Sequence, residues 1–173
     1  MNIRALIRDI PDFPKPGIVF KDITPVLADG PALRWIVERL AERYRGRVDA
    51  VVGIESRGFL IGAPVAYELG VGLCLVRKPG KLPHDTHAVT YELEYGSDAL
   101  EIHRDTLRAG ARVIVLDDLL ATGGTAVATV ELVGAAGGHV IECGFLIELG
   151  FLAGRDRLTP TPCFSLVRYD GGD

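Results

Sequence analysis

Two adjacent carboxylates, Asp117 and Asp118, precede a turn of hydroxyl and glycine residues, and together these residue types could bind a phosphorylated sugar. Glycines permit positive φ and close backbone approach, while threonines supply hydroxyls and a predicted helix cap. Amide N–H groups at a helix start favour a phosphate. Carboxylates would repel that phosphate, so we expect them to accept hydrogen bonds from hydroxyls beside it. The turn residues are Ala121, Thr122, Gly123, Gly124 and Thr125.

Apolar segments on either side of this motif predict the elements that position it. Residues 113–116 are consecutive apolar, mostly β-branched residues, as expected of a parallel strand covered on both faces. The Ala-rich run 126–136 predicts a helix after the turn. A strand, an acid pair, a turn and a helix in this order are typical of an α/β binding site. The competing interpretation is an ordinary loop followed by a capped helix, which this order disfavours.

A second strand end carries a similar set of residues. The apolar run 48–54 predicts a strand, and residues 59–69 predict the helix that follows. Between them lie Ser56, Arg57 and Gly58, a small hydroxyl residue, a cation and a glycine at a helix start. This arrangement predicts a second phosphate site. A surface salt bridge is the alternative role for Arg57.

A basic turn follows a third predicted strand, residues 73–76. Arg77, Lys78 and Lys81 surround a Pro-Gly turn there, and three cations could neutralise a polyphosphate, although a short charge run is usually a solvated loop. Residues 89–103 then show alternating apolar and polar side chains around a turn, which predicts a β-hairpin. Its position between the basic turn and the central strand is suited to a lid.

The remaining segments continue an α/β alternation. Residues 1–10 place apolar residues at helical spacing and predict a short amphipathic helix, and residues 31–45 predict a longer one. Residues 139–149 and 163–167 predict further strands, with a short helix or loop at 150–158. The fold class predicted from this alternation is α/β, with a mostly parallel, right-handed central sheet flanked by helices.

Composition limits the class of protein. The 173 residues are expected to form one domain, 1–173, with a substantial core, because 48% are apolar and 24% are charged. The net charge of −4 gives no general basic field for nucleic acid. No apolar run approaches the roughly 18 residues of a membrane helix, and no leader pattern follows Met1, so we expect a cytoplasmic protein without a membrane partner. The absence of a P-loop motif excludes a P-loop nucleotide hydrolase.

The three cysteines, Cys74, Cys143 and Cys163, lie in or beside apolar strand-like runs. They form no CxxC pair, and no histidine lies at ligand spacing. We therefore expect buried free thiols rather than a disulfide or a structural zinc site.

Residues 113–125 resemble the phosphoribosyl pyrophosphate (PRPP) binding motif of type I phosphoribosyltransferases. The resemblance implies that the acid pair contacts the ribose hydroxyls and that the turn holds the 5′-phosphate. It also implies that the turn at 56–58 binds pyrophosphate and that Arg57 touches the base. Mg²⁺ is the implied cofactor, bound through PRPP or pyrophosphate and not by direct protein ligands. The pyrophosphate-binding residues expected are Ser56, Arg57, Gly58, Arg77, Lys78 and Lys81.

Two further stretches narrow the resemblance to adenine phosphoribosyltransferases. Residues 13–25 contain a similar Phe-Pro-x-Pro-Gly segment followed by Asp-Ile-Thr-Pro, whose prolines exclude a helix. The resemblance makes residues 1–28 an N-terminal arm and hood over the base, whereas the residues alone fit a tied-down arm equally well. Residues 78–103 resemble the family's flexible catalytic loop and form the implied lid. The residues implied to contact adenine are Val19, Phe20, Arg57 and Leu149.

These features imply an enzyme that transfers the 5-phosphoribosyl group from PRPP to adenine, giving AMP and pyrophosphate, and that forms a homodimer. A PRPP-sensing transcriptional regulator is a competing class, but the first ten residues are too short for a DNA-binding segment. A phosphoribosyltransferase for hypoxanthine, guanine or orotate is the nearer alternative. Pro79 and residues 84–87 depart from the family pattern in the lid. The residues implied to act in catalysis are Asp117, Asp118, Arg57 and Glu94, the last a proposed acid in the lid beside Tyr95.

Overall fold

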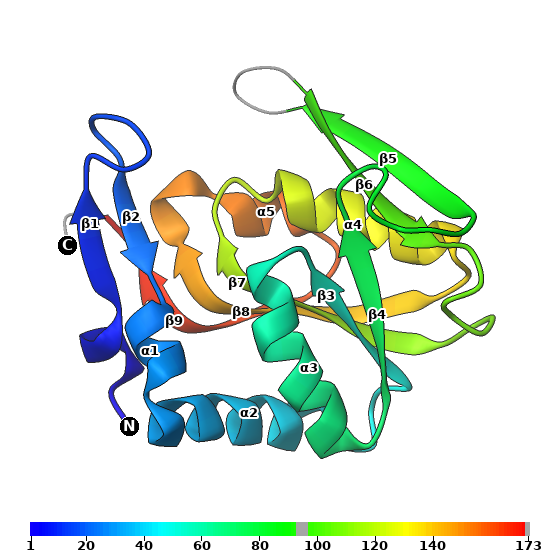
Figure 1. Ribbon diagram of the computed structural model, residues 1–173, viewed down its shortest axis with the longest axis horizontal. Coiled ribbons are helices and arrows are strands. Elements are labelled where there is room, and N and C mark those ends of the chain that lie inside the picture. Colours follow the sequence, from blue (N-terminus) through cyan, green and yellow to red (C-terminus); the bar gives the residue numbers. More distant parts are fainter. Residues whose placement is uncertain (93–96, 172–173) are drawn as a thin grey trace.

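A seven-stranded sheet is the centre of the computed structural model, which describes residues 1–92 and 97–171 (Figure 1). The strand order in this part of the chain is β5-β6-β4-β3-β7-β8-β9. The predicted α/β class with a mostly parallel sheet is confirmed. Five adjacent strands are parallel to one another: β3 (Ala50–Ile54), β4 (Gly72–Arg77), β7 (Arg112–Leu120), β8 (His139–Leu149) and β9 (Cys163–Tyr169).

Helices cover both faces of the sheet because its central strands bury apolar side chains on both sides. Successive residues of β3 show this alternation, since Val51 packs in one core cluster and Val52 in the other. Figure 1 shows the resulting three layers. One face is covered by α1 (Thr24–Ala28), α2 (Gly30–Tyr44) and α3 (Arg57–Leu69), and the other by α4 (Gly124–Ala135) and α5 (Gly154–Leu158), which follows the turn η2 (Gly150–Leu152).

The predicted hairpin lies at one edge of the sheet. β5 (Thr86–Glu92) pairs antiparallel with β6 (Ser97–His103), and β6 pairs with the end of β4 through Val76 and Ile102. Figure 1 shows the hairpin, in green, rising beyond β4 and α4. Val89 and Tyr91 pack against the core on the α4 face, so the hairpin is docked on the body of the protein.

The predicted helix over residues 1–10 is wrong. Only η1 (Ile3–Leu6) turns, as a 3-10 helix, and the chain then forms β1 (Arg8–Pro11), which pairs antiparallel with β2 (Val19–Asp22). Pairing with β2 provides hydrogen-bond partners for backbone N–H and C=O groups of residues 8–11. In a helix that ends before Pro11, the last C=O groups would lack partners within the helix. The two-stranded sheet of β1 and β2 lies beside β9, at the opposite edge of the large sheet. There the ammonium group of Lys21 on β2 is 4.1 Å from the centre of the Tyr169 ring on β9.

The cysteines are free thiols in the part of the chain that the structure describes, as predicted. Cys74 and Cys143 are buried, whereas Cys163 is half-buried. Burial raises the pKa of the Cys143 thiol to about 12 and that of Cys163 to about 11. Over residues 1–92 and 97–171, none of the helices has both the length and the apolar character required to cross a bilayer.

Candidate active site

The acid pair lies inside β7 and not after it. The predicted strand 113–116 continues to Leu120, because β7 keeps its pairing with β8 as far as Leu120 and Glu148. Asp117 is half-buried and Asp118 is only 4% exposed. The amide of Asp118 donates a 2.8 Å hydrogen bond to Oδ1 of Asp117, so the two carboxylates are fixed relative to each other.

The turn after β7 leads into α4 with its amide groups uncapped. Gly123, at φ 86°, occupies the N-cap position, and as a glycine it has no side chain that could accept a hydrogen bond from the first turn of the helix. The predicted threonine cap is therefore wrong, because the residue that enters the helix is a glycine. The turn encloses a cavity of about 80 Å³. Free N–H groups at a helix start beside such a cavity suit an anion.

Close backbone contact holds this turn in place. A Cβ added to Gly123 would lie 2.6 Å from the carbonyl oxygen of Gly154, and one added to Gly154 would lie 2.2 Å from the carbonyl oxygen of Ala121. Neither position has room for a side chain. The beginning of α5 therefore supports the turn directly.

The motif after β3 meets the acid pair. Nε of Arg57 is 2.6 Å from Oδ2 of Asp118. Gly58 permits this approach, because a Cβ there would lie 2.7 Å from the carbonyl oxygen of Leu116 and 3.0 Å from Oδ1 of Asp117. The two strand-end motifs found in the sequence are thus brought together at one place.

The basic turn contributes one cation to the same place. Lys78 donates its backbone N–H to Oε2 of Glu55 over 2.8 Å, and its ammonium group pairs with Asp98. Burial lowers the pKa of Lys78, but the Asp98 carboxylate outweighs burial and the pKa is raised, so the side chain stays charged. Arg77 donates to Oε1 of Glu55 and to the carbonyl oxygen of Lys81 instead.

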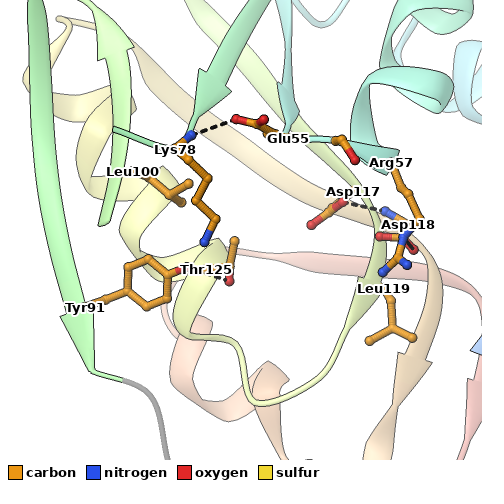
Figure 2. A pocket seen from close by; sticks show the side chains of 10 residues that line it. Glu55, Arg57, Lys78, Tyr91, Leu100, Asp117, Asp118, Leu119 and Thr125 are labelled. Atoms are coloured by element: carbon orange, nitrogen blue, oxygen red, sulfur yellow. Dashed lines mark hydrogen bonds and ion pairs between the residues drawn. The ribbon is translucent and has the colours of Figure 1, made fainter. Parts of the chain in front are cut away.

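These groups surround a cavity of about 420 Å³ (Figure 2). Figure 2 shows Lys78 reaching across it towards Tyr91 and Thr125, with Arg57 beside Asp118. The second, smaller cavity shares Asp117 and Thr125 with it, so the two are adjacent. The lining residues are Glu55, Ser56, Arg57, Lys78, Tyr91, Leu100, Asp117, Asp118, Leu119 and Thr125.

Sequence reasoning missed four of the lining residues. The sequence contained a signal for Glu55 as a site residue, because Glu55 directly follows a predicted strand. The signal for Tyr91 was weaker, since Tyr91 is one of several alternating apolar residues in the predicted hairpin. Leu100 and Leu119 carried no signal beyond being apolar. Conversely, Arg77 and Lys81 were predicted but are not among the residues that line the cavity.

Three of the four predicted adenine contacts, Val19, Phe20 and Leu149, lie outside the cavity lining, whereas Arg57 is part of it. Val19 is 46% exposed on β2, and Leu149 is half-buried at the end of β8. The guanidinium carbon of Arg57 lies 5.2 Å from the centre of the Phe20 ring, which connects β2 with the cavity. Glu94 and Tyr95 fall outside the described residues.

The charges of the site suit a sugar phosphate. Burial and the neighbouring Asp118 carboxylate raise the pKa of Asp117 well above its usual range. Burial also acts to raise the pKa of Glu55, but hydrogen bonds from Lys78 and Arg77 outweigh it and the net shift is downward. Within the described residues, no group of three or more His, Cys, Asp or Glu side chains could hold a metal ion. Carboxylates that could accept hydrogen bonds from hydroxyls therefore lie beside cations and amides of the kind that suit a phosphate.

Comparison with known proteins gives consistent matches over nearly the whole chain. Residues 26–170 match the phosphoribosyl transferase domain family. The adenine phosphoribosyltransferase of Roseiflexus sp. (strain RS-1) is 59% identical over 169 residues, which cover 97% of this chain and 98% of that protein.

Solved structures agree with these sequence matches. The adenine phosphoribosyltransferase of Thermoanaerobacter pseudethanolicus has a TM-score of 0.94 at 53% identity, covering 97% of this chain and 98% of that one. The Saccharomyces cerevisiae adenine phosphoribosyltransferase, solved with adenine and D-2,5-dideoxy-2,5-imino-altritol 1,6-bisphosphate, has a TM-score of 0.90 at 40% identity, covering 95% and 96% of the two chains.

Proposed function

Because this chain belongs to the phosphoribosyl transferase family, among the adenine phosphoribosyltransferases, we propose that it transfers the 5-phosphoribosyl group of PRPP to adenine. The products are AMP and pyrophosphate, and the reaction serves purine salvage. The observation that carries the proposal is the cavity in which Asp117, Asp118 and Arg57 meet beside the turn that ends at Thr125.

We assign the turn at 121–125 to the 5′-phosphate. Its cavity of about 80 Å³ lies against the uncapped start of α4, where the N–H groups and the helix dipole favour an anion. Thr125 borders both cavities and can donate its hydroxyl to the phosphate. The phosphate would thus fix the substrate while its ribose extends into the larger cavity.

We assign Asp117 and Asp118 to the ribose. Their oxygens can accept hydrogen bonds from its hydroxyls, and this fixes the anomeric carbon in the cavity. Displacement at a sugar carbon passes through an oxocarbenium-like transition state. Nearby carboxylate charge stabilises that positive charge as it develops.

The leaving pyrophosphate requires positive charge. We assign it to Lys78 and to the turn formed by Ser56, Arg57 and Gly58, while Arg77 holds Glu55 in place. Mg²⁺ would arrive on the substrate phosphates, since the described carboxylates form no cage of their own and Mg²⁺ prefers phosphates and water as ligands. When bound, the ion would supply charge that neutralises pyrophosphate.

We assign the base side to the N-terminal hood, residues 1–28, and to the end of β8. Val19, Phe20 and Leu149 would contact adenine there, and Arg57 would connect hood and cavity through its contact with Phe20. The hairpin at residues 78–103 would close as a lid and keep water off the activated sugar. An acid role for Glu94, a lid role for Tyr95, a homodimer and a cytoplasmic location stay predictions.

Incubation of the protein with PRPP, Mg²⁺ and each purine base in turn tests the proposed function. AMP and pyrophosphate should form in equal amounts with adenine, and rates with hypoxanthine and guanine should be far lower. Preferential formation of another nucleotide would show that a base other than adenine is the substrate. Formation of no nucleotide with any base would overturn the proposal.

A further inference from the structure

β8 carries a buried carboxylate near each end, and the one next to the cavity is not used by the proposed chemistry. Glu142 is 6% exposed and Glu148 is 2% exposed. Glu142 accepts from Arg43 and from the Tyr44 hydroxyl, both on α2, and none of these three residues is among those that line the two cavities. Glu148 pairs with Leu120, the last residue of β7, and therefore lies where the acid-pair strand enters the phosphate turn.

Glu148 is the centre of a dense set of hydrogen bonds. Arg155 donates to it twice, from Nε over 3.0 Å and from Nη2 over 2.5 Å. Ser165 donates from Oγ over 2.6 Å and Arg168 from Nη1 over 3.0 Å. Hydrogen bonds from Arg155 lower the pKa of Glu148, more than burial raises it, so the carboxylate is ionised. A buried, ionised and fully bonded group fixes the elements that it joins.

Through Arg155 this carboxylate reaches the phosphate turn. Arg155 is the second residue of α5, and the residue before it, Gly154, touches the carbonyl oxygen of Ala121 so closely that no Cβ would fit. Arg157 adds a 3.3 Å hydrogen bond to the carbonyl oxygen of Thr122. α5 has only five residues, too few to be a stable helix alone, so its position depends on such anchors.

On its other side Glu148 is followed by Leu149, which we assign to the base. A Cβ added to the next residue, Gly150, would lie 2.8 Å from Nε of Arg168, so the guanidinium group packs directly against this segment. Arg168 is itself a partner of Glu148. The carboxylate is thus connected through one arginine to the phosphate turn and through another to the segment beside the base.

We propose that Glu148 and Arg155 are positioning residues, which hold the phosphate turn and the base-side end of β8 at a fixed separation. Neither residue lines the cavity, so each acts through backbone that does. This proposal rests on the proposed function, which assigns the turn to the 5′-phosphate and the end of β8 to adenine. Its physical content is that loss of the Glu148–Arg155 pair displaces the turn and weakens substrate binding.

Arg155→Lys is the main test, because lysine keeps the charge but loses the two parallel hydrogen bonds. The Michaelis constant for PRPP should rise roughly tenfold, since a small displacement of a binding element is enough for such a loss. kcat should change by less than about threefold, because the 5′-phosphate contact binds ground state and transition state alike. Glu148→Gln should raise the Michaelis constants for both PRPP and adenine.

The matched control is Arg43→Lys. Arg43 makes the same two-bond pair with Glu142 on the same strand, and the two arginine side chains are similarly exposed, at 37% and 40%. Arg43→Lys should lower the melting temperature about as much as Arg155→Lys does, while both Michaelis constants stay at wild-type values. This comparison separates positioning from a general loss of stability.

Calorimetric titration with PRPP and Mg²⁺ accompanies the kinetics, so that binding is measured even if no base is turned over. Wild-type protein that binds PRPP but transfers to no base would contradict the proposed function alone. Equal PRPP affinity in Arg155→Lys and Arg43→Lys would overturn the positioning role. If Glu148→Gln does not fold, the two lysine variants still decide the question.

Discussion

At the scale of single residues, Asp118 has an unusual environment for an acidic side chain. It is 4% exposed, and its Oδ2 lies 2.6 Å from Nε of Arg57. Within the part of the chain that the structure describes, that oxygen makes no hydrogen bond of good geometry. A buried carboxylate left partly unsatisfied costs stability, and this pattern is typical of a functional position.

Asp118→Asn should lower kcat/KM for PRPP by about 100-fold or more, because the amide removes the charge that stabilises the sugar cation in the transition state. The melting temperature should change little, since the substituted oxygen has few partners to lose. Steady-state rates with adenine and a thermal unfolding curve provide the two measurements.

Asp49→Asn is the control for that variant. Asp49 is held by Arg108 and Arg112 at the start of the parallel strands, away from the cavity lining. Its substitution should lower the melting temperature and leave kcat/KM at the wild-type value. A wild-type kcat/KM in Asp118→Asn would show that the Asp118 carboxylate has no role in the mechanism.

Gly58→Ala should impair both stability and activity. The new Cβ would lie 2.7 Å from the carbonyl oxygen of Leu116 and close to Asp117, so β7 or the start of α3 must move. We expect a loss of about 1–3 kcal/mol in the free energy of unfolding, as for other overpacked sites. Urea unfolding and the Michaelis constant for PRPP measure the two effects. In Gly30→Ala the new Cβ would meet no atom of the described residues within 4 Å beyond its chain neighbours and its own helix backbone, so this variant should show neither effect. A Gly58→Ala protein as stable as the wild type would contradict the packing argument.

The site residues that were predicted from the sequence share one property. Their position in the fold follows from the order of strand, turn and helix in the residues next to them. Arg57, Asp117 and Thr125 each follow a recognisable strand and precede or enter a helix, so their place at the end of a parallel strand could be predicted. Tyr91 reaches the cavity only because the hairpin docks on α4, and Arg77 leaves it because Glu55 competes for its guanidinium. Such contacts depend on side chains distant in sequence, which no local pattern contains.

At the scale of elements, the errors have the same origin. Residues 1–10 do have helical spacing, but β2 offers a strand partner and tertiary pairing overrides the local pattern. Likewise β7 was predicted to end at Leu116, because the carboxylates that follow are polar, yet pairing with β8 extends it to Leu120. The hairpin was predicted correctly, since a period of two around a turn is a local signal.

Asp98→Asn should loosen the hairpin. Asp98 pairs with the ammonium group of Lys78 and accepts from the Tyr91 hydroxyl, and Tyr91 in turn accepts from Thr125. With the charge removed, the hairpin should open more often, and limited proteolysis between residues 79 and 103 should be about threefold faster. Cleavage rates followed by mass spectrometry measure the effect.

Asp105→Asn controls for a changed charge near the same hairpin. Asp105 is 71% exposed and lies 3.8 Å from His84, so its loss should leave the cleavage rate unchanged. Addition of PRPP and Mg²⁺ should slow cleavage in the wild type if the hairpin closes as proposed. Equal cleavage of Asp98→Asn and wild type would show that this ion pair does not hold the hairpin.

At the scale of the whole molecule, two opposite electrostatic effects meet in one sheet. Burial and the Asp118 charge raise the pKa of Asp117, so its protonated carboxyl group contributes stability at low pH, and this stability is lost as pH rises through that pKa. Burial acts to raise the pKa of Glu142, but hydrogen bonds from Arg43 and Tyr44 outweigh it and lower that pKa. Hydrogen bonds from Arg155 lower the pKa of Glu148, so the stability that both glutamates contribute is present above the usual glutamate pKa. We propose a balance in which the stability linked to Asp117 on β7 is lost as pH rises, whereas the stability linked to Glu142 and Glu148 on neighbouring β8 is lost as pH falls.

Glu142→Gln should flatten the acid side of the stability profile. Folded Glu142 keeps its charge to lower pH than an unfolded glutamate does, so the wild type gains stability above about pH 4.5 and loses it as pH falls through the lowered pKa. We expect the variant to be about 1–2 kcal/mol less stable at pH 7, a small value because Arg43 is 37% exposed, and the difference to narrow below pH 4. Urea unfolding from pH 3 to pH 7 measures both curves. A constant difference across that range would mean that packing around Glu142, and not its charge, supplies the stability, and the balance proposed between β7 and β8 would then be wrong.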